Sequence, residues 1–276
     1  QAFQQLSNSK IDKFVTSLGI TPEYLGSSRY INEAHSIGGF TGVSPVQLAN
    51  AYSAFGNGGY FTEAHSINKI VYKNGSEDDV VDFNFEKKRV MKDTTAYMIS
   101  SMLKKVTNSS IKVEGTEIST KTGTSSYDSN TLKKLKLSNN VIQDAWTVTF
   151  TKDYSVAIWY GYDNLTKKTY NTSSHAWSER TKIQKAIVTK VMEKNSTFDI
   201  PSGIVKSKVV VGTNPPKLPN ASTPSSKVQT HLFIKGTEPT STVYYSPKVE
   251  TKSEEDTEET EESTEEEIEI PDILEP

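Results

Sequence analysis

The sequence predicts an α+β fold in which helices pack on one side of an antiparallel sheet. Residues 145–150 and 154–162 read as two strands, separated only by a tight turn at Lys152-Asp153. Strands joined so closely pair in an antiparallel manner. Apolar side chains recur at helical spacing before and after this pair, so helices are expected to pack against the sheet.

The first sixty residues are expected to be mainly helical. Apolar residues within 1–20 fall on one helical face, and Gly19 follows as a stop signal. Ser44 can cap the free N–H groups of a later helix, and Pro45 suits its first position. The remaining elements expected here are a short helix at 30–36, a glycine-rich turn at 38–42, and glycines 56, 58 and 59 as the end of the Ser44 helix.

The middle of the chain combines strands with one further helix. Residues 67–73 read as a strand that runs into a hairpin turn at Asn74-Gly75. Asp93 is expected to cap a helix whose apolar face extends to Val106. Residues 118–124 read as another strand.

The later elements are less regular. Residues 125–143 are polar and are predicted to form a loop, and residues 181–194 a helix. After Pro201, two short strands are expected at 209–211 and 231–235, separated by a proline-rich linker or extended arm at 214–226.

Charge divides the chain into a basic body and an acidic tail. Residues 253–276 hold 13 Asp and Glu and no Lys or Arg, which leaves 31 basic and 21 acidic residues in 1–252. The tail has too few apolar side chains to offset its chain entropy, so we expect it to be disordered. A basic body suits an anionic neighbour such as a cell wall, a membrane surface or nucleic acid, or it is simply a solvated surface.

Composition excludes several kinds of site. The chain has no cysteine, which excludes disulfides, thiolate metal sites and a cysteine nucleophile. The four histidines are scattered, so no metal site and no cofactor are expected. No apolar run is long enough to span a membrane, and the chain opens without Met, as if it were cut from a longer protein.

The sharpest chemical signal is Lys121-Thr122-Gly123-Thr124. Penicillin-recognising serine enzymes carry such a segment on an edge strand beside the nucleophile. A substrate that ends in a carboxylate needs a cation, supplied by Lys121, and hydroxyl donors, supplied by Thr122 and Thr124. Gly123 removes a side chain where the substrate approaches the strand, and the N–H of Thr124 would face the oxyanion.

Several separated segments resemble the transpeptidase domain of class A penicillin-binding proteins. Residues 37–49 are similar to the glycine-rich turn and following helix of that family, and residues 51–60 continue the match. Residues 144–146 and 156–163 resemble its paired strands after the KTG strand. A last similar segment lies at 233–239, so the resemblance covers about residues 1–240 in the family's order.

The resemblance implies a fold like that of penicillin-binding transpeptidases and serine β-lactamases, here incomplete at the N-terminus. It also implies a D,D-transpeptidase that cross-links peptidoglycan stem peptides through a serine acyl-enzyme and binds β-lactams. Lys121 would be the catalytic residue of this chain, and Thr122, Gly123 and Thr124 its substrate-binding residues. The implied parent is bacterial, extracytoplasmic and held to the membrane only by an absent N-terminal anchor. It would also be a glycosyltransferase that acts on lipid II-derived glycan strands, with no nucleic-acid partner.

The family's other two motifs, SxxK and SxN, are expected to lie before residue 1, so the fragment alone would be inactive. Weak matches do occur within the chain: Ser7–Lys10 and Ser101–Lys104 for SxxK, and Ser66–Asn68 and Ser138–Asn140 for SxN. Short patterns of this kind arise by chance in a chain rich in Ser, Asn and Lys. Trp146 and Trp159 are expected in the core, and Trp177 either has a structural role or lines a substrate groove.

Three parts are therefore predicted: the C-terminal part of a transpeptidase domain at 1–200, a proline-rich extension with short strands at 201–252, and a disordered acidic tail at 253–276. Two alternatives remain. One is a D,D-carboxypeptidase or β-lactamase relative, and the other is a non-catalytic module that binds the cell wall. Removal of upstream core elements would expose apolar helix faces, so poor stability of the isolated chain is expected.

Overall fold

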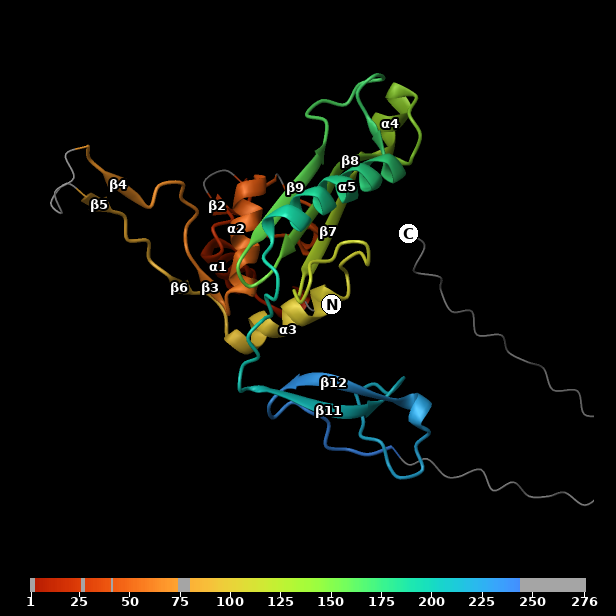
Figure 1. Cartoon of the computed structure of the whole chain (residues 1–276). Coiled ribbons are helices and arrows are strands. Elements are labelled where there is room, and N and C mark those ends of the chain that lie inside the picture. The colour runs from red at the N-terminus through yellow and green to blue at the C-terminus, as the bar shows by residue number, and fades with distance from the viewer. Residues whose placement is uncertain (1–2, 26–27, 41, 74–79, 244–276) are drawn as a thin grey trace, which may run out of the picture.

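The computed structural model describes residues 3–25, 28–40, 42–73 and 80–243. At its centre lies an antiparallel sheet in which β8 pairs with three other strands (Figure 1). The strands of this sheet are β7 (Ser119–Ser126), β8 (Val141–Phe150), β9 (Ser155–Gly161) and β10 (Asn171–Thr172). The predicted α+β class is confirmed.

Helices cover both faces of this sheet rather than the expected single face (Figure 1). On one face α5 (Ser173–Val191) crosses β8 and β9, where its Gln184 contacts Thr149 of β8. Residues of β8 alternate between faces, so Phe150 points the other way. There it packs against Tyr52 of α2 (Pro45–Gly56) and Tyr97 of α3 (Asp93–Lys104).

The cluster around Phe150 joins elements that are far apart in sequence. Phe150 is fully buried, and its ring centroid lies 6.0 Å from that of Tyr52, 6.3 Å from that of Phe55 and 6.0 Å from that of Phe198. The last turn of α2 also presses on the turn between β8 and β9. A Cβ on Gly56 would lie 2.2 Å from the carbonyl oxygen of Thr151, so only glycine fits there.

The N-terminal region consists of short elements: η1 (Phe3–Gln5), α1 (Asn8–Ser17), β1 (Tyr24–Leu25), β2 (Ser28–Arg29) and η2 (Glu33–Ile37). Three small antiparallel pairs, β1–β2, β3–β6 and β4–β5, complete this half. Their remaining strands are β3 (Tyr60–Phe61), β4 (Lys69–Val71), β5 (Val80–Asp82) and β6 (Lys88–Arg89). The β4–β5 pair projects away from the body of the molecule (Figure 1).

A separate two-stranded unit follows the central sheet. Strands β11 (Ile204–Val210) and β12 (Val228–Ile234) pair along their whole length. Ile204 and Leu232 pack on the cluster of Tyr97, Phe150 and Phe198, which ties this unit to the body. The proline-rich segment 214–226 does not act as a linker between parts: it connects β11 to β12, leads into η4 (Ser225–Lys227), and bridges to Thr242 through Leu218.

Two sequence predictions for polar segments were wrong. Within the expected loop 125–143 lies α4 (Ser129–Leu135), whose first N–H groups are capped by the carboxylate of Asp128. Leu132 is its one buried residue, so the helix shows no apolar periodicity. The last helix begins at Ser173 instead of Thr181. The sequence pattern missed its first two turns because they bury the charged Arg180 and, besides it, only Ala176.

Other boundaries shifted by smaller amounts. The helical stretch predicted at 1–20 is divided into η1 and α1, and the helix expected at 30–36 is a 3-10 turn capped by Asn32. Asp93 is the first residue of α3 and not its cap, which is Lys92. The capping role of Ser44 is confirmed, since its side chain accepts from the N–H of Gln47. The predicted Asn74-Gly75 turn and the acidic tail lie outside the described residues.

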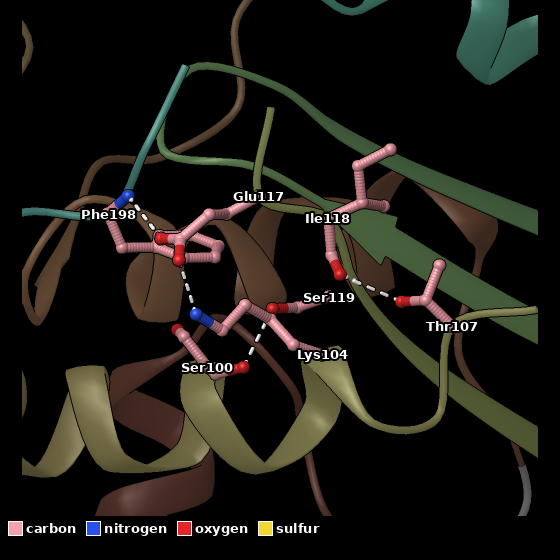
Figure 2. A network of polar contacts seen from close by, with 7 residues as sticks. All are labelled: Ser100, Lys104, Thr107, Glu117, Ile118, Ser119 and Phe198. Atoms are coloured by element: carbon pink, nitrogen blue, oxygen red, sulfur yellow. Dashed lines mark hydrogen bonds and ion pairs between the residues drawn. The ribbon is translucent and has the colours of Figure 1, made fainter. Parts of the chain in front are cut away.

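A polar network ties α3 to the start of β7 (Figure 2). The ammonium of Lys104 pairs with one carboxylate oxygen of Glu117, and the other oxygen accepts from the N–H of Phe198 at 3.0 Å. Beside it the hydroxyl of Ser119 donates to the carbonyl of Ser100 at 2.8 Å. The network therefore anchors the strand that carries the KTGT segment to the helix beneath it.

Replacing Glu117 with Ala is expected to lower the free energy of unfolding by about 2 kcal/mol, because it leaves Lys104 and the Phe198 N–H without their acceptor. Both charged side chains are only about 30% exposed, so water can replace the lost contacts only in part. Glu114 supplies a matched control, because its ion pair with Lys194 is well exposed and its loss should cost about 0–1 kcal/mol. Equilibrium urea unfolding of the protein measures both variants, and equal losses would contradict the role given to Glu117.

Candidate active site

The KTGT segment forms the middle of strand β7. Its strand lies at the edge of the central sheet, since β8 is its only partner within the described ranges. Side chains alternate along a strand, so Thr122 and Thr124 share one face and Lys121 and Gly123 the other. Lys121 and Thr124 are exposed and Thr122 is half-buried. An edge strand with exposed hydroxyls can pair with an extended peptide and still contact its polar end.

Helix α5 lines the face that carries the two threonines. The indole N–H of Trp177 donates to the hydroxyl of Thr124 at 3.1 Å. Two turns later along the helix, Gln184 donates to Thr149 at 2.6 Å and to Thr120 at 3.4 Å. The structure therefore places Trp177 beside the candidate site. Residues 177, 180 and 184 recur at helical spacing, and that pattern could have marked the polar face of α5 in the sequence.

Lys121 lies on the opposite face of β7 from the two threonines. Its ammonium donates to the carbonyl of Thr122, and the side chain is exposed. Gly123 lies opposite Trp146 in the register, and a Cβ there would come within 3.4 Å of the Trp146 Cβ. That distance is an ordinary van der Waals contact, so the neighbouring strand does not by itself require glycine at this position.

Asp144 lies at the outer end of the site. Its carboxylate accepts from the hydroxyl of Ser125 and, at 2.7 Å, from the indole N–H of Trp159. Burial, together with this carboxylate, raises the pKa of Tyr127 above its ordinary value. Trp146 and Trp159 are only half-buried, so the expectation that both lie in the core was wrong. Their rings instead pack against each other, 6.5 Å apart at the centroids.

Arg180 is a buried cation on the threonine face. Only 8% of the residue is exposed, and its Nη1 donates to the carbonyl of Trp146 at 3.0 Å. Burial lowers the pKa of this guanidinium below its ordinary value, although arginine stays charged under all physiological conditions. Trp146 is paired with Gly123, so the positive charge is bonded to the strand next to the KTGT segment. Sequence reasoning did not single out Arg180.

The described residues of the weak SxxK and SxN matches lie in separate local contacts and do not come together as a second site. Ser7 precedes α1 as its N-cap, and Lys104 is engaged by Glu117 at the end of β7 remote from Thr124. Ser138 and Asn140 bond to each other within a turn. Among the described residues, no group of three or more His, Asp and Glu side chains is placed to hold a metal ion.

Comparison with known protein families shows which family the chain belongs to. Residues 5–198 match the family model of the penicillin-binding protein transpeptidase domain. The chain belongs to this transpeptidase family. Residues 200–246 match a second model, the C-terminal domain of penicillin-binding protein 1A, in the region that contains β11 and β12.

Relatives of this chain include class A penicillin-binding proteins from bacteria. The chain is 34% identical over 262 residues to penicillin-binding protein 1A/1B of Bacillus subtilis, covering 92% of this chain and 28% of the relative. It is 33% identical over 181 residues to penicillin-binding protein 1A of Streptococcus pneumoniae, covering 63% of this chain and 24% of the relative. It thus spans about a quarter of the length of these relatives.

A solved structure supports the fold. Penicillin-binding protein 1A from Haemophilus influenzae superposes with a TM-score of 0.58 at 20% identity, covering 88% of this chain and 39% of that one. Among the described residues of the transpeptidase, no helix combines the length and apolar character needed to cross a bilayer.

Proposed function

We propose that this chain supplies the KTGT half of a D,D-transpeptidase site that cross-links peptidoglycan stem peptides. The observation that carries this proposal is the position of Lys121, Thr122 and Thr124 on an exposed edge strand within a chain of the transpeptidase family. The terminal carboxylate of the donor stem peptide binds the hydroxyls of Thr122 and Thr124. Lys121 supplies the positive charge that holds this anion near the strand.

The reaction proceeds in two acyl transfers. A serine oxygen attacks the carbonyl of the D-Ala-D-Ala peptide bond, the C–N bond breaks, and the departing D-Ala takes up a proton at its nitrogen. An amine of a second stem peptide then attacks the ester, forms the new amide and releases the serine. Lys121 stabilises developing negative charge and assists proton transfer, and the N–H of Thr124 faces the oxyanion.

A β-lactam enters the same site because its carboxylate and its strained amide imitate the donor. Attack opens the ring, but the leaving nitrogen stays attached to the acyl group and continues to occupy the site. Deacylation is therefore slow, and the adduct accumulates as a covalent label.

The serine nucleophile, its lysine base and the SxN motif belong, in this proposal, to a part of the parent protein outside residues 1–276. The parent is bacterial, membrane-anchored and active outside the cytoplasm. It also joins lipid II-derived glycan strands through a separate glycosyltransferase domain. Its C-terminal region is divided as proposed from the sequence: transpeptidase to about residue 200, a proline-rich extension to 252, and the acidic tail.

Covalent labelling with a fluorescent penicillin tests this proposal on two proteins, the chain 1–276 and the full-length parent. The parent is expected to label and the isolated chain to remain unlabelled, because KTGT binds the carboxylate but forms no bond. Boiled parent protein serves as the control for non-specific attachment. Labelling of the isolated chain would overturn the assignment of the nucleophile, and the modified peptide would then distinguish Ser7 from Ser101.

A further inference from the structure

The indole of Trp177 fixes which way the hydroxyl of Thr124 can donate. The nitrogen of the ring lies 3.1 Å from the threonine oxygen, a contact between residues 53 positions apart. An indole N–H donates and cannot accept, so the threonine oxygen must be the acceptor. The single hydroxyl hydrogen of Thr124 is then directed toward another group.

The indole itself is held in place by its surroundings. Trp177 packs against the cluster of Ile142, Ala145 and Ala176, in which Ala145 and Ala176 are fully buried. One turn further along α5, Arg180 is bonded to the carbonyl of Trp146. These contacts pack the helix against β8 and place the donor nitrogen beside β7.

The hydroxyl of Thr124 lies on an exposed part of the edge strand. Thr124 is exposed, and Thr122 lies two residues earlier on the same face of the strand. A carboxylate offers only acceptors, so it requires hydroxyls whose hydrogens point toward it. A threonine that already accepts from a fixed neutral donor is prepared for that task and loses less rotational freedom when the anion binds.

We propose that Trp177 is a positioning residue for carboxylate recognition by this transpeptidase. It acts through Thr124, whose hydroxyl it orients toward the carboxylate of the donor stem peptide or of a β-lactam, and it makes no contact with the reacting bond. This inference rests on the function proposed above.

The test uses the full-length parent protein with Trp177→Phe, which keeps an aromatic ring but removes the N–H donor. Second-order acylation rates are measured with benzylpenicillin and with its methyl ester, which lacks the anionic carboxylate. The variant is expected to lower the rate with benzylpenicillin by about fivefold, which is the effect of losing one hydrogen bond. The rate with the ester should stay unchanged. A general loss of folding would slow both reactions together.

A second variant, Thr124→Val, removes the hydroxyl and preserves the shape of the side chain. If Trp177 acts through Thr124, adding Trp177→Phe to Thr124→Val has no further effect on either rate. The inference would be overturned if Trp177→Phe left the ratio of the acid and ester rates unchanged. It would also be overturned if the effects of Trp177→Phe and Thr124→Val on the benzylpenicillin rate were fully additive. Failure of the wild-type parent to form any adduct would instead overturn the proposed function.

Discussion

Replacing Lys121 with Ala in the full-length parent is expected to lower the second-order rate of acylation by benzylpenicillin by about two to three orders of magnitude. Lys121 is exposed on an edge strand, and its ammonium donates to the carbonyl of the neighbouring Thr122. Its removal should therefore leave the fold intact, so the loss would report chemistry. The measurement is stopped-flow acylation, together with thermal unfolding as a check on folding.

The effect should be this large because the same cation is expected to stabilise two negative charges. In the proposed mechanism the substrate carboxylate binds along the strand, and negative charge develops on the carbonyl oxygen during attack. Lys121→Arg is the matched control, because it keeps the positive charge but does not release a proton near neutral pH. It should recover part of the binding and little of the proton transfer. A Lys121→Ala rate within about threefold of wild type would contradict the role proposed for Lys121.

Replacing Phe150 with Ala is expected to give the largest loss of stability, about 3–5 kcal/mol. The ring is fully buried and contacts Tyr52, Phe55 and Phe198, so its removal leaves a cavity bounded by aromatic side chains. Ile204 and Leu232 of the C-terminal unit pack on the same cluster. The cavity should thus loosen α2, the central sheet and β11–β12 together.

Urea unfolding of the transpeptidase domain measures this loss. Phe150→Leu is the control, since it refills much of the space and should cost about 1–2 kcal/mol. The thermal midpoint of Phe150→Ala should fall by about 10 °C. A loss below about 1 kcal/mol would show that the surrounding side chains collapse into the space, and that Phe150 does not join these elements.

The elements that were predictable from sequence are those with a clear apolar period or a strong cap. Strands β8 and β9 and the helix that begins at Ser44 and Pro45 are of this kind. Helix α4 and the first two turns of α5 were not predictable in this way. Helix α4 has a single buried leucine, and the first two turns of α5 bury only Ala176 and the charged Arg180, so neither segment shows a period of large apolar residues.

The same distinction holds for the site. Lys121, Thr122, Gly123 and Thr124 are adjacent in sequence, so a short motif was enough to find them. The partnership between Trp177 and Thr124 depends on the position of a helix relative to a strand, and on a start of α5 that the sequence did not reveal. Asp144 and Trp159 meet only through the register of β8 and β9.

The central claim is that the KTGT strand holds the substrate carboxylate while the serine comes from elsewhere in the parent protein. A crystal structure of the full-length parent acylated by benzylpenicillin tests it most directly. The penicillin carboxylate is expected within about 3 Å of the hydroxyls of Thr122 and Thr124, and the ester on a serine outside residues 1–276. A carboxylate bound away from β7, or an ester on a serine within this chain, would contradict it.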